Sequence, residues 1–124
     1  MTVRLTRLKT RRDFLRVAAG RVRAVRPGLI LQAVPQPEAK AEGAETPPRV
    51  GFTASKRVGN AVARNRAKRR LRAAAASVLA QRGKSGMDYV LIARGNTGAR
   101  PYTELLADLE SALRQLAQAS GEAR

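Results

Sequence analysis

The sequence predicts a single-domain α+β fold in which helices pack on one four-stranded sheet. Three observations support this class. Short apolar or alternating runs, typical of strands, are interspersed with longer segments of helical periodicity. Their order along the chain is αβββαβα. A length of 124 residues and an apolar share of 44% suit one domain, residues 1–124, and an aromatic share of 3% predicts a core of aliphatic side chains and alanine.

The first helix is predicted from Arg11 to about Ala18, with Thr10 as its N-cap. Phe14 belongs to the apolar face of this helix. Composition gives a core position for this ring about the same weight as an exposed role, because the chain has only two Phe. Residues 1–10 are basic, and we expect them to be mobile at the extreme end of the chain.

The four predicted strands follow from short apolar runs and turn signals. The first two, 21–25 and 29–34, are expected to pair as a hairpin across a Pro-Gly turn. Residues 35–48 hold three Glu, one Lys and four Pro, which predicts a flexible acidic loop that is a poor RNA contact. The third and fourth strands, 49–54 and 88–94, flank a helix as in a βαβ unit, for which general rules favour a right-handed crossover.

The longest predicted helix follows Asn60, a good N-cap, and runs to about Arg82. Positions 64–72 hold six basic residues, and the whole stretch 46–87 contains no acid. A solvated surface helix usually mixes its signs, so contact with a polyanion such as nucleic acid is favoured over a plain solvated face. Small and apolar residues at helical spacing mark the buried side of this helix: Ala63, Ala67, Leu71, Ala74 and Val78.

The last helix is predicted from Tyr102 to about Ala119, with Pro101 at its start. Its leucines recur at helical spacing and its acids fall on the exposed side, which indicates a packing role and a poor RNA surface. The tail at 120–124 is expected to be mobile.

The charge balance narrows the possible partners. With 25 basic against 9 acidic residues the formal net charge is +16, which favours nucleic acid or an anionic membrane. The sequence has no run of 18 apolar residues, so we expect that nothing in it spans a bilayer. It lacks an apolar signal-peptide core, so we expect a cytoplasmic location, and we expect no membrane partner. The absence of Cys and His excludes disulfides and catalysis by thiolate or imidazole.

The segment from Gly51 to Arg72, GFTASKRVGNAVARNRAKRRLR, resembles the signature segment of the protein subunit of bacterial ribonuclease P, with its Arg-Asn-Arg core at 64–66. An Asp-Phe pair at 13–14 and a Tyr-hydrophobic-Ala-Arg strand at 89–94 extend the resemblance over nearly the whole chain. The resemblance implies a single-domain α/β sandwich of the ribosomal protein S5 domain 2-like class. It also implies a left-handed crossover between the third and fourth strands, an exception to the general rule.

The same resemblance implies an RNA-binding subunit with no catalytic residue of its own. In this family a catalytic RNA removes the 5′ leader of precursor tRNA with magnesium ions held mainly by the RNA. The protein binds the leader and promotes substrate and magnesium binding. The lack of His and the scattering of the nine acids agree with that division of labour, and the sequence assigns no metal ligand in the protein.

The resemblance implies two RNA surfaces. The first comprises the basic helix and its approach, and it faces the catalytic RNA: Lys56, Arg57, Arg64, Asn65, Arg66, Lys68, Arg69 and Arg72. The second is a cleft between the first helix and the open sheet face for the single-stranded leader: Phe14, Arg11, Gln32 and Phe52. Ala18 and Gln32 stand where the family commonly has aromatics, so hydrogen bonding or backbone charge is an alternative to base stacking. Arg70 replaces a usually apolar residue, and its stem is predicted to snorkel at the edge of the core.

Three other classes compete with this interpretation. A small basic ribosomal or other structural RNA-binding protein, with no role in tRNA processing, is the strongest alternative. A DNA-binding protein is weaker, because no second helix precedes the basic helix at helix-turn-helix spacing, and no DNA partner is expected. A membrane-surface protein is weaker still, because the side of the helix opposite the charge offers mostly alanine.

Overall fold

The computed structural model describes residues 5–37 and 46–119. The segments for which the sequence predicts mobility, 1–10, 35–48 and 120–124, fall partly or wholly outside these ranges. In chain order the elements are β1 (Thr6–Arg7), α1 (Arg11–Ala19), β2 (Arg23–Val25), β3 (Leu29–Pro35), β4 (Arg49–Thr53), the 3₁₀ turn η1 (Lys56–Val58), α2 (Ala61–Arg82), β5 (Met87–Ala93) and α3 (Tyr102–Ala119).

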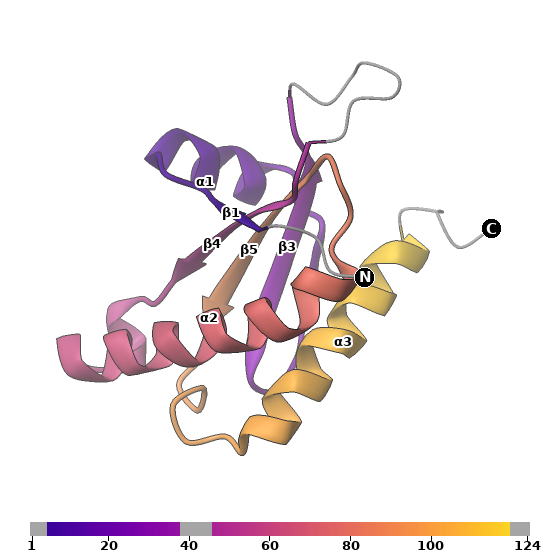
Figure 1. Cartoon of the computed structure of the whole chain (residues 1–124). Coiled ribbons are helices and arrows are strands. Elements are labelled where there is room, and N and C mark those ends of the chain that lie inside the picture. Colours follow the sequence, from indigo (N-terminus) through magenta and orange to yellow (C-terminus); the bar gives the residue numbers. More distant parts are fainter. Residues whose placement is uncertain (1–4, 38–45, 120–124) are drawn as a thin grey trace.

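The strands form one mixed sheet in the order β1-β4-β5-β3-β2 (Figure 1). The predicted hairpin of β2 and β3 is confirmed by antiparallel pairing, and β3 continues antiparallel to β5. β4 and β5 are parallel neighbours connected through α2, which confirms the βαβ unit. The handedness of this crossover stays a prediction.

β1 is an element that the sequence analysis missed. Thr6 and Arg7 pair in parallel with Arg49 and Val50 of β4, and the following Leu8 is buried. A strand of two residues is too short to show the alternation on which strand prediction depends. The sheet therefore has five strands in place of the predicted four.

The main core lies between one face of the sheet and the pair α2 and α3 (Figure 1). Alternation in β3 sends Leu29, Leu31 and Ala33 to this face, as predicted. The many alanines on the buried side of α2 let the helix lie close to the strands. Its buried residues confirm most of the predicted stripe and widen it: Ala67, Leu71, Ala74, Ala75, Val78 and Leu79.

α1 packs on the opposite face of the sheet, against β3 and β5. Phe14 lies directly against β4 because Gly51 has no side chain: a Cβ at Gly51 would be 2.4 Å from the Cζ of Phe14. The ring is half-buried, so Phe14 is both a packing residue and accessible. The cluster that it joins is small: Leu8, Val17, Val34 and Val90, with Phe14 and Ile92 at its edge.

A buried carboxylate also ties α1 to the sheet. Asp88 of β5 is fully buried, and it accepts hydrogen bonds from Arg49 Nε at 2.7 Å, from the same guanidinium at 2.8 Å, and from Arg16 of α1. Arg16 also pairs with Asp13 at 3.2 Å. Burial opposes the charge on Arg16, but the hydrogen bonds to Asp88 and Asp13 outweigh burial and raise its pKa. The polar groups of this junction are therefore matched in charge.

Candidate nucleic-acid interface

The start of α2 is fixed by its sequence. Asn60 caps the helix, its side-chain oxygen accepting a hydrogen bond from the backbone N–H of Ala63 at 2.9 Å. Gly59 before it has φ 143°, a conformation that L side chains rarely adopt. This turn joins η1, which carries the exposed Lys56 and Arg57, to the basic part of α2.

The basic side chains of α2 lie on the parts of the helix that the core leaves uncovered. Arg66, Arg69 and Arg72 are exposed, whereas Arg64 and Lys68 are half-buried. The residues of the first predicted surface thus lie on two consecutive elements, η1 and α2. We call it the α2 basic surface: Lys56, Arg57, Arg64, Asn65, Arg66, Lys68, Arg69 and Arg72.

Phe52 does not lie in the predicted leader cleft. In β4 it pairs with Leu91, and both side chains belong to the core on the α2 side of the sheet. The Cζ of Arg72 lies 5.6 Å from the centroid of the Phe52 ring, a cation–π distance. Because alternate residues of a strand point to opposite faces, Gly51 and Thr53 face α1 and Phe52 cannot. Phe52 instead supports the α2 basic surface from beneath.

Arg70 has a structural role that the sequence analysis did not identify. Its half-buried guanidinium donates to the carbonyl of Thr97 at 3.1 Å and to that of Arg100. Arg66, one turn earlier, donates to the carbonyl of Gly98 at 3.2 Å. Both arginines therefore fix α2 to the loop between β5 and α3. The sequence predicted that the stem of Arg70 would be partly buried; the structure adds that its guanidinium is hydrogen-bonded to this loop.

That loop is itself held by buried polar groups. Thr97 is fully buried; its hydroxyl donates to the carbonyl of Gly28 at 2.7 Å and accepts from the N–H of Arg94 at 2.7 Å. Asp108 of α3 accepts from the N–H of Gly28 at 3.0 Å and from Arg100 Nε at 2.6 Å. The bond to Asp108 raises the pKa of Arg100. The basic part of α2 is thus hydrogen-bonded to a loop that is itself hydrogen-bonded to the β2–β3 turn and to α3.

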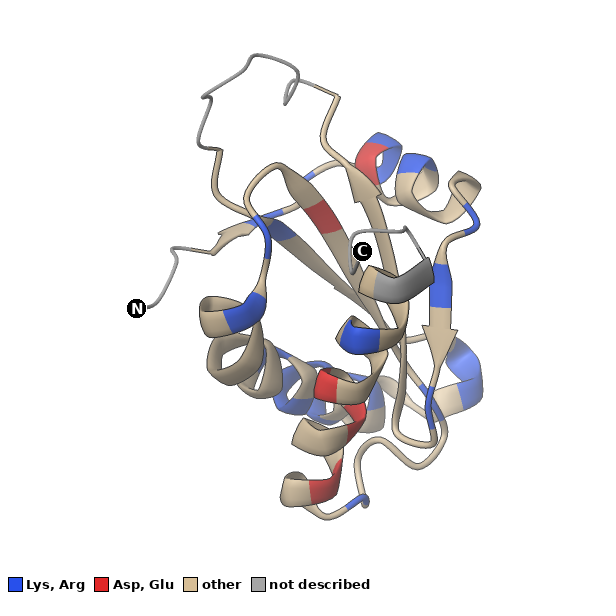
Figure 2. Cartoon of the chain, turned by 90° about the vertical axis from the view of Figure 1, so that its right-hand side faces the viewer, with Lys and Arg blue, Asp and Glu red and all other residues tan. Residues whose placement is uncertain are grey.

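Charges are distributed unevenly among the helices (Figure 2). Three of the described acids, Glu104, Asp108 and Glu110, lie on α3. The described part of α2 carries no acid, and cations also occur on α1 and β2. A polyanion is therefore attracted to α2 and to the α1 side of the sheet more strongly than to α3.

On the α1 side, part of the sheet face stays open beside the helix. Strand register places Val25, Ile30, Ile92 and Thr53 in one row across β2, β3, β5 and β4. Each of these side chains is at least partly exposed, in contrast to the buried Val90. With strands ~4.8 Å apart, this floor row spans about 14 Å. Three of its four side chains are aliphatic, so the row is a mostly apolar strip on the face of the sheet.

Two of the predicted cleft residues lie next to the floor row. Gln32 pairs with Val90 in the adjacent row, and Phe14 lies over that row at Gly51. Arg11 is exposed at the start of α1. The structure thus brings Phe14 and Gln32 to the same face of the sheet, separates Phe52 from them, and adds the floor row. Alternation had assigned Ile30 to the face opposite Leu31, but its partners on the other strands depend on register, which the sequence does not show.

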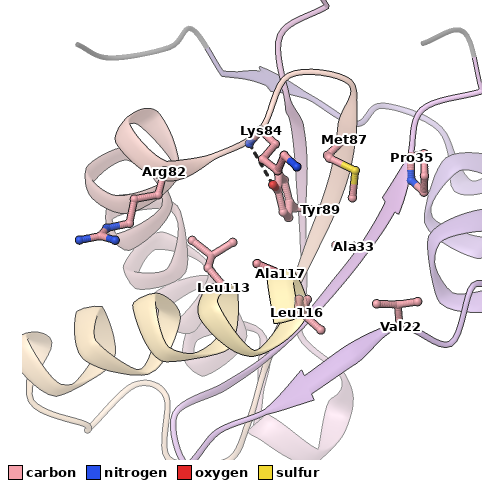
Figure 3. Close-up of a pocket in the computed structure, with 10 residues that line it drawn as sticks. All are labelled: Val22, Ala33, Pro35, Arg82, Lys84, Met87, Tyr89, Leu113, Leu116 and Ala117. Carbon is pink, nitrogen blue, oxygen red and sulfur yellow. Dashed lines mark hydrogen bonds between the residues drawn. The ribbon is translucent and has the colours of Figure 1, made fainter. Parts of the chain in front are cut away.

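A separate apolar pocket lies on the other side of the sheet (Figure 3). Its volume is about 190 Å³, and Tyr89 at its wall accepts a hydrogen bond from the N–H of Lys84 at 3.0 Å. Arg82 at its edge lies 3.9 Å from Glu110. Its walls are mostly aliphatic, which does not suit phosphate: Val22, Ala33, Pro35, Met87, Leu113, Leu116 and Ala117.

Two further classes of site were sought in the described residues. Within 5–37 and 46–119, His, Cys, Asp and Glu do not gather in groups of three or more that could hold a metal ion. Among the helices in the same ranges, none has the length and apolar character needed to cross a bilayer.

Comparison with known proteins gives one consistent family. The family described as Ribonuclease P matches residues 3–117. The chain is 53% identical over 116 residues to the ribonuclease P protein component of Paramagnetospirillum magneticum, covering 94% of this chain and 86% of the relative. It is also 53% identical over 110 residues to that of Ruegeria pomeroyi, covering 88% and 84%.

Solved structures support the same fold. The RNase P protein of Staphylococcus aureus matches with a TM-score of 0.68 and 24% identity, over 87% of this chain and 92% of that one. The RNase P protein of Thermotoga maritima matches with a TM-score of 0.68 and 22% identity, over 88% and 96%. With its fold, its acid-free basic helix and a family match over most of its length, the chain belongs to the ribonuclease P protein family.

Proposed function

We propose that this chain binds a catalytic RNA through the α2 basic surface and helps that RNA to remove the 5′ leader from precursor tRNA. As a member of the ribonuclease P protein family, the chain is a subunit of an endoribonuclease and a partner of the ribonuclease P RNA. The observation that carries the proposal is the α2 basic surface itself, a dense set of cations with no acid in the surrounding stretch 46–87. The ribosomal alternative is not favoured by the family match.

The chemistry of the side chains supports assigning catalysis to the RNA. The sequence has no His, and the buried Asp88 and Asp108 are held by arginines, so their carboxylates are engaged in structure. Arginine binds phosphate well but does not ligate magnesium, which prefers oxygen donors. We therefore assign magnesium mainly to the RNA. The cations of the α2 basic surface neutralise phosphates and so help the RNA fold around its ions.

The floor row beside α1 supports the second part of the proposal, binding of the leader. An unpaired strand lying there would meet aliphatic side chains below and the half-exposed Phe14 at the side. The Gln32 amide in the adjacent row adds hydrogen-bonding capacity. Contacts of this kind tolerate many base sequences, because each base offers an apolar face.

The proposal is tested by reconstitution with a bacterial ribonuclease P RNA on precursor tRNA. At low magnesium, we expect the protein to raise the rate of correct 5′ cleavage well above that of the RNA alone. A variant with both Arg57 and Arg69 changed to Ala, two exposed residues of the α2 basic surface, should lose most of this effect. Arg114→Ala, which removes an exposed arginine from α3, is the matched control. Equal rates with and without wild-type protein would contradict the proposal.

A further inference from the structure

Two arginines stand at the β2 edge of the sheet, at the opposite end of the floor row from η1 and α2. Arg23 pairs with Gln32, so its side chain is on the α1 face, one row from Val25 and Ile30. Arg21 precedes β2, just after α1. Both arginines are exposed, whereas Ala24 is fully buried. β2 is an edge strand, so nothing else in the sheet covers this side.

The backbone at Arg21 is unusual. Its φ of 60° makes it the single non-glycine residue with a positive φ in the described part of the chain. This conformation ends α1, with the N–H of Arg21 donating to the carbonyl of Ala18 at 3.2 Å. Glycine would adopt it without the steric conflict that a Cβ brings. Strained backbone of this kind is often found where a side chain has a function beyond stability.

Arg21 and Arg23 can also pair with an anion from outside the protein. Within the described residues, neither guanidinium forms an ion pair with a carboxylate, in contrast to Arg16, Arg49 and Arg100. On the other side of the floor row, Thr53 is followed closely by η1 with Lys56 and Arg57. The floor row is thus bordered by cations at both of its ends, beyond Val25 and beyond Thr53.

We propose that Arg21 and Arg23 bind a phosphate of the RNA strand that crosses the floor row, so that the strand is held at both ends of the row. This inference rests on the proposed function and adds to it a contact at the far end of the leader path. Phosphate is the fitting partner because exposed guanidinium groups beside an apolar surface match a strand whose bases face the floor and whose backbone stays charged.

The geometry makes the contact dependent on leader length. A leader that ends before β2 cannot reach Arg23, whereas one that crosses the whole floor row can. The test uses the assembled protein–RNA complex and precursor tRNAs whose leaders are lengthened one nucleotide at a time. Affinity is measured for wild type, Arg23→Ala, Arg21→Gly and the control Arg114→Ala.

For long leaders we expect Arg23→Ala to lower affinity about two- to fivefold and to reduce the slope of log affinity against log salt by about 0.7. For the shortest leaders it should match wild type. Arg21→Gly should move two measurements in opposite directions. Its melting temperature should rise by about 2 to 5 °C as the strain is relieved, while affinity for long leaders falls.

The inference is overturned if both variants behave like Arg114→Ala at every leader length, or if their losses are the same for short and long leaders. If Arg21→Gly gains stability and keeps full affinity for long leaders, Arg21 is not a contact. These outcomes differ from failure of the proposed function, in which wild-type protein itself would give no increase in cleavage.

Discussion

Neighbouring arginines of α2 have different tasks, although the sequence presents them as one run. Arg69 is exposed and belongs to the α2 basic surface, whereas the guanidinium of Arg70 is held by the carbonyls of Thr97 and Arg100. A charge run therefore has to be divided residue by residue into groups that meet a partner and groups that hold the fold.

Replacing Arg69 with Ala should weaken binding to the ribonuclease P RNA without unfolding the domain. Each lost phosphate contact lowers the slope of log affinity against log salt by about 0.7 to 0.9. The measurement is a salt titration of binding for wild type and variant, with Arg114→Ala as the control. An unchanged slope would show that Arg69 faces solvent in the complex.

Replacing Arg70 with Met should have the opposite profile. The stem is kept, but two carbonyls of the β5–α3 loop lose their donor, which is expected to cost about 1 to 3 kcal/mol of folding free energy. Chemical denaturation measures this loss. A variant as stable as wild type but impaired in RNA affinity would instead place Arg70 among the RNA contacts.

Phe14 packs against the sheet and is partly exposed beside the proposed leader site, and two substitutions separate packing from leader binding. Phe14→Ala should lower the free energy of unfolding by about 2 to 4 kcal/mol, because it removes the ring that packs against Gly51. The loss is smaller than for a fully buried ring, because Phe14 is only half-buried. Phe14→Leu should keep most of the stability yet lower the preference for precursor over mature tRNA about 5-fold or more, since stacking is lost. The readouts are melting curves and competition binding. Equal losses for precursor and mature tRNA in Phe14→Leu would remove Phe14 from the leader site.

At the scale of elements, α1 depends on charge as much as on apolar contact. It reaches the sheet through a small cluster and through the arginines around Asp88. Burial alone would raise the pKa of the Asp13 carboxyl, but hydrogen bonds from Arg16 and Thr10 and the charge of Arg49 lower it below the usual 3.8. The docking of α1 is therefore sensitive to acid.

The lowered pKa of Asp13 means that the free energy of unfolding falls when this carboxyl is protonated. The ionised Asp13 stabilises the fold fully above its unfolded pKa of 3.8, and this contribution is lost as the pH falls below that value. In Asp13→Asn the contribution is absent at every pH. Unfolding free energies measured from pH 7 down to pH 2 should therefore differ between wild type and variant at neutral pH and converge in acid. A gap that stays constant with pH would mean that Asp13 acts through shape alone.

Most elements could be predicted from the sequence, because caps and periodicity are local. Asn60 fixes the start of α2, and alternation correctly assigned Leu31 and Ile30 to opposite faces. β1 was missed because its two residues are ordered only by pairing with β4. The charge of the α2 basic surface could be read from the sequence. Phe52 was placed on the wrong face of the sheet, and the hydrogen bonds of Arg70 were missed, because both depend on tertiary neighbours that sequence spacing does not contain.

At the scale of the whole molecule, the uneven distribution of charge favours one orientation of the protein relative to a bound RNA. α2 and the α1 side of the sheet carry many cations, and α3 carries Glu104, Asp108 and Glu110. A folded RNA in contact with the first two surfaces leaves α3 towards solvent.

The whole protein, highly purified and free of RNA, is expected to have no leader-removing activity of its own. The reason is chemical: the sequence offers no imidazole, and the buried carboxylates are engaged with arginines. The measurement is incubation of precursor tRNA with protein before and after addition of the ribonuclease P RNA. Robust 5′ cleavage before that addition would assign the active site to the protein.

The small apolar contact between α1 and the sheet affects how easily this helix detaches. The cluster beneath this helix contains few buried side chains, while α2 and α3 share the main core. The least supported helix detaches locally at lower free energy than global unfolding requires, so its amides exchange with solvent sooner than those of the other two. An RNA strand that contacts both α1 and the floor row binds only the attached form, and mass action then favours that form. The proposed leader site therefore predicts that leader binding slows amide exchange in α1.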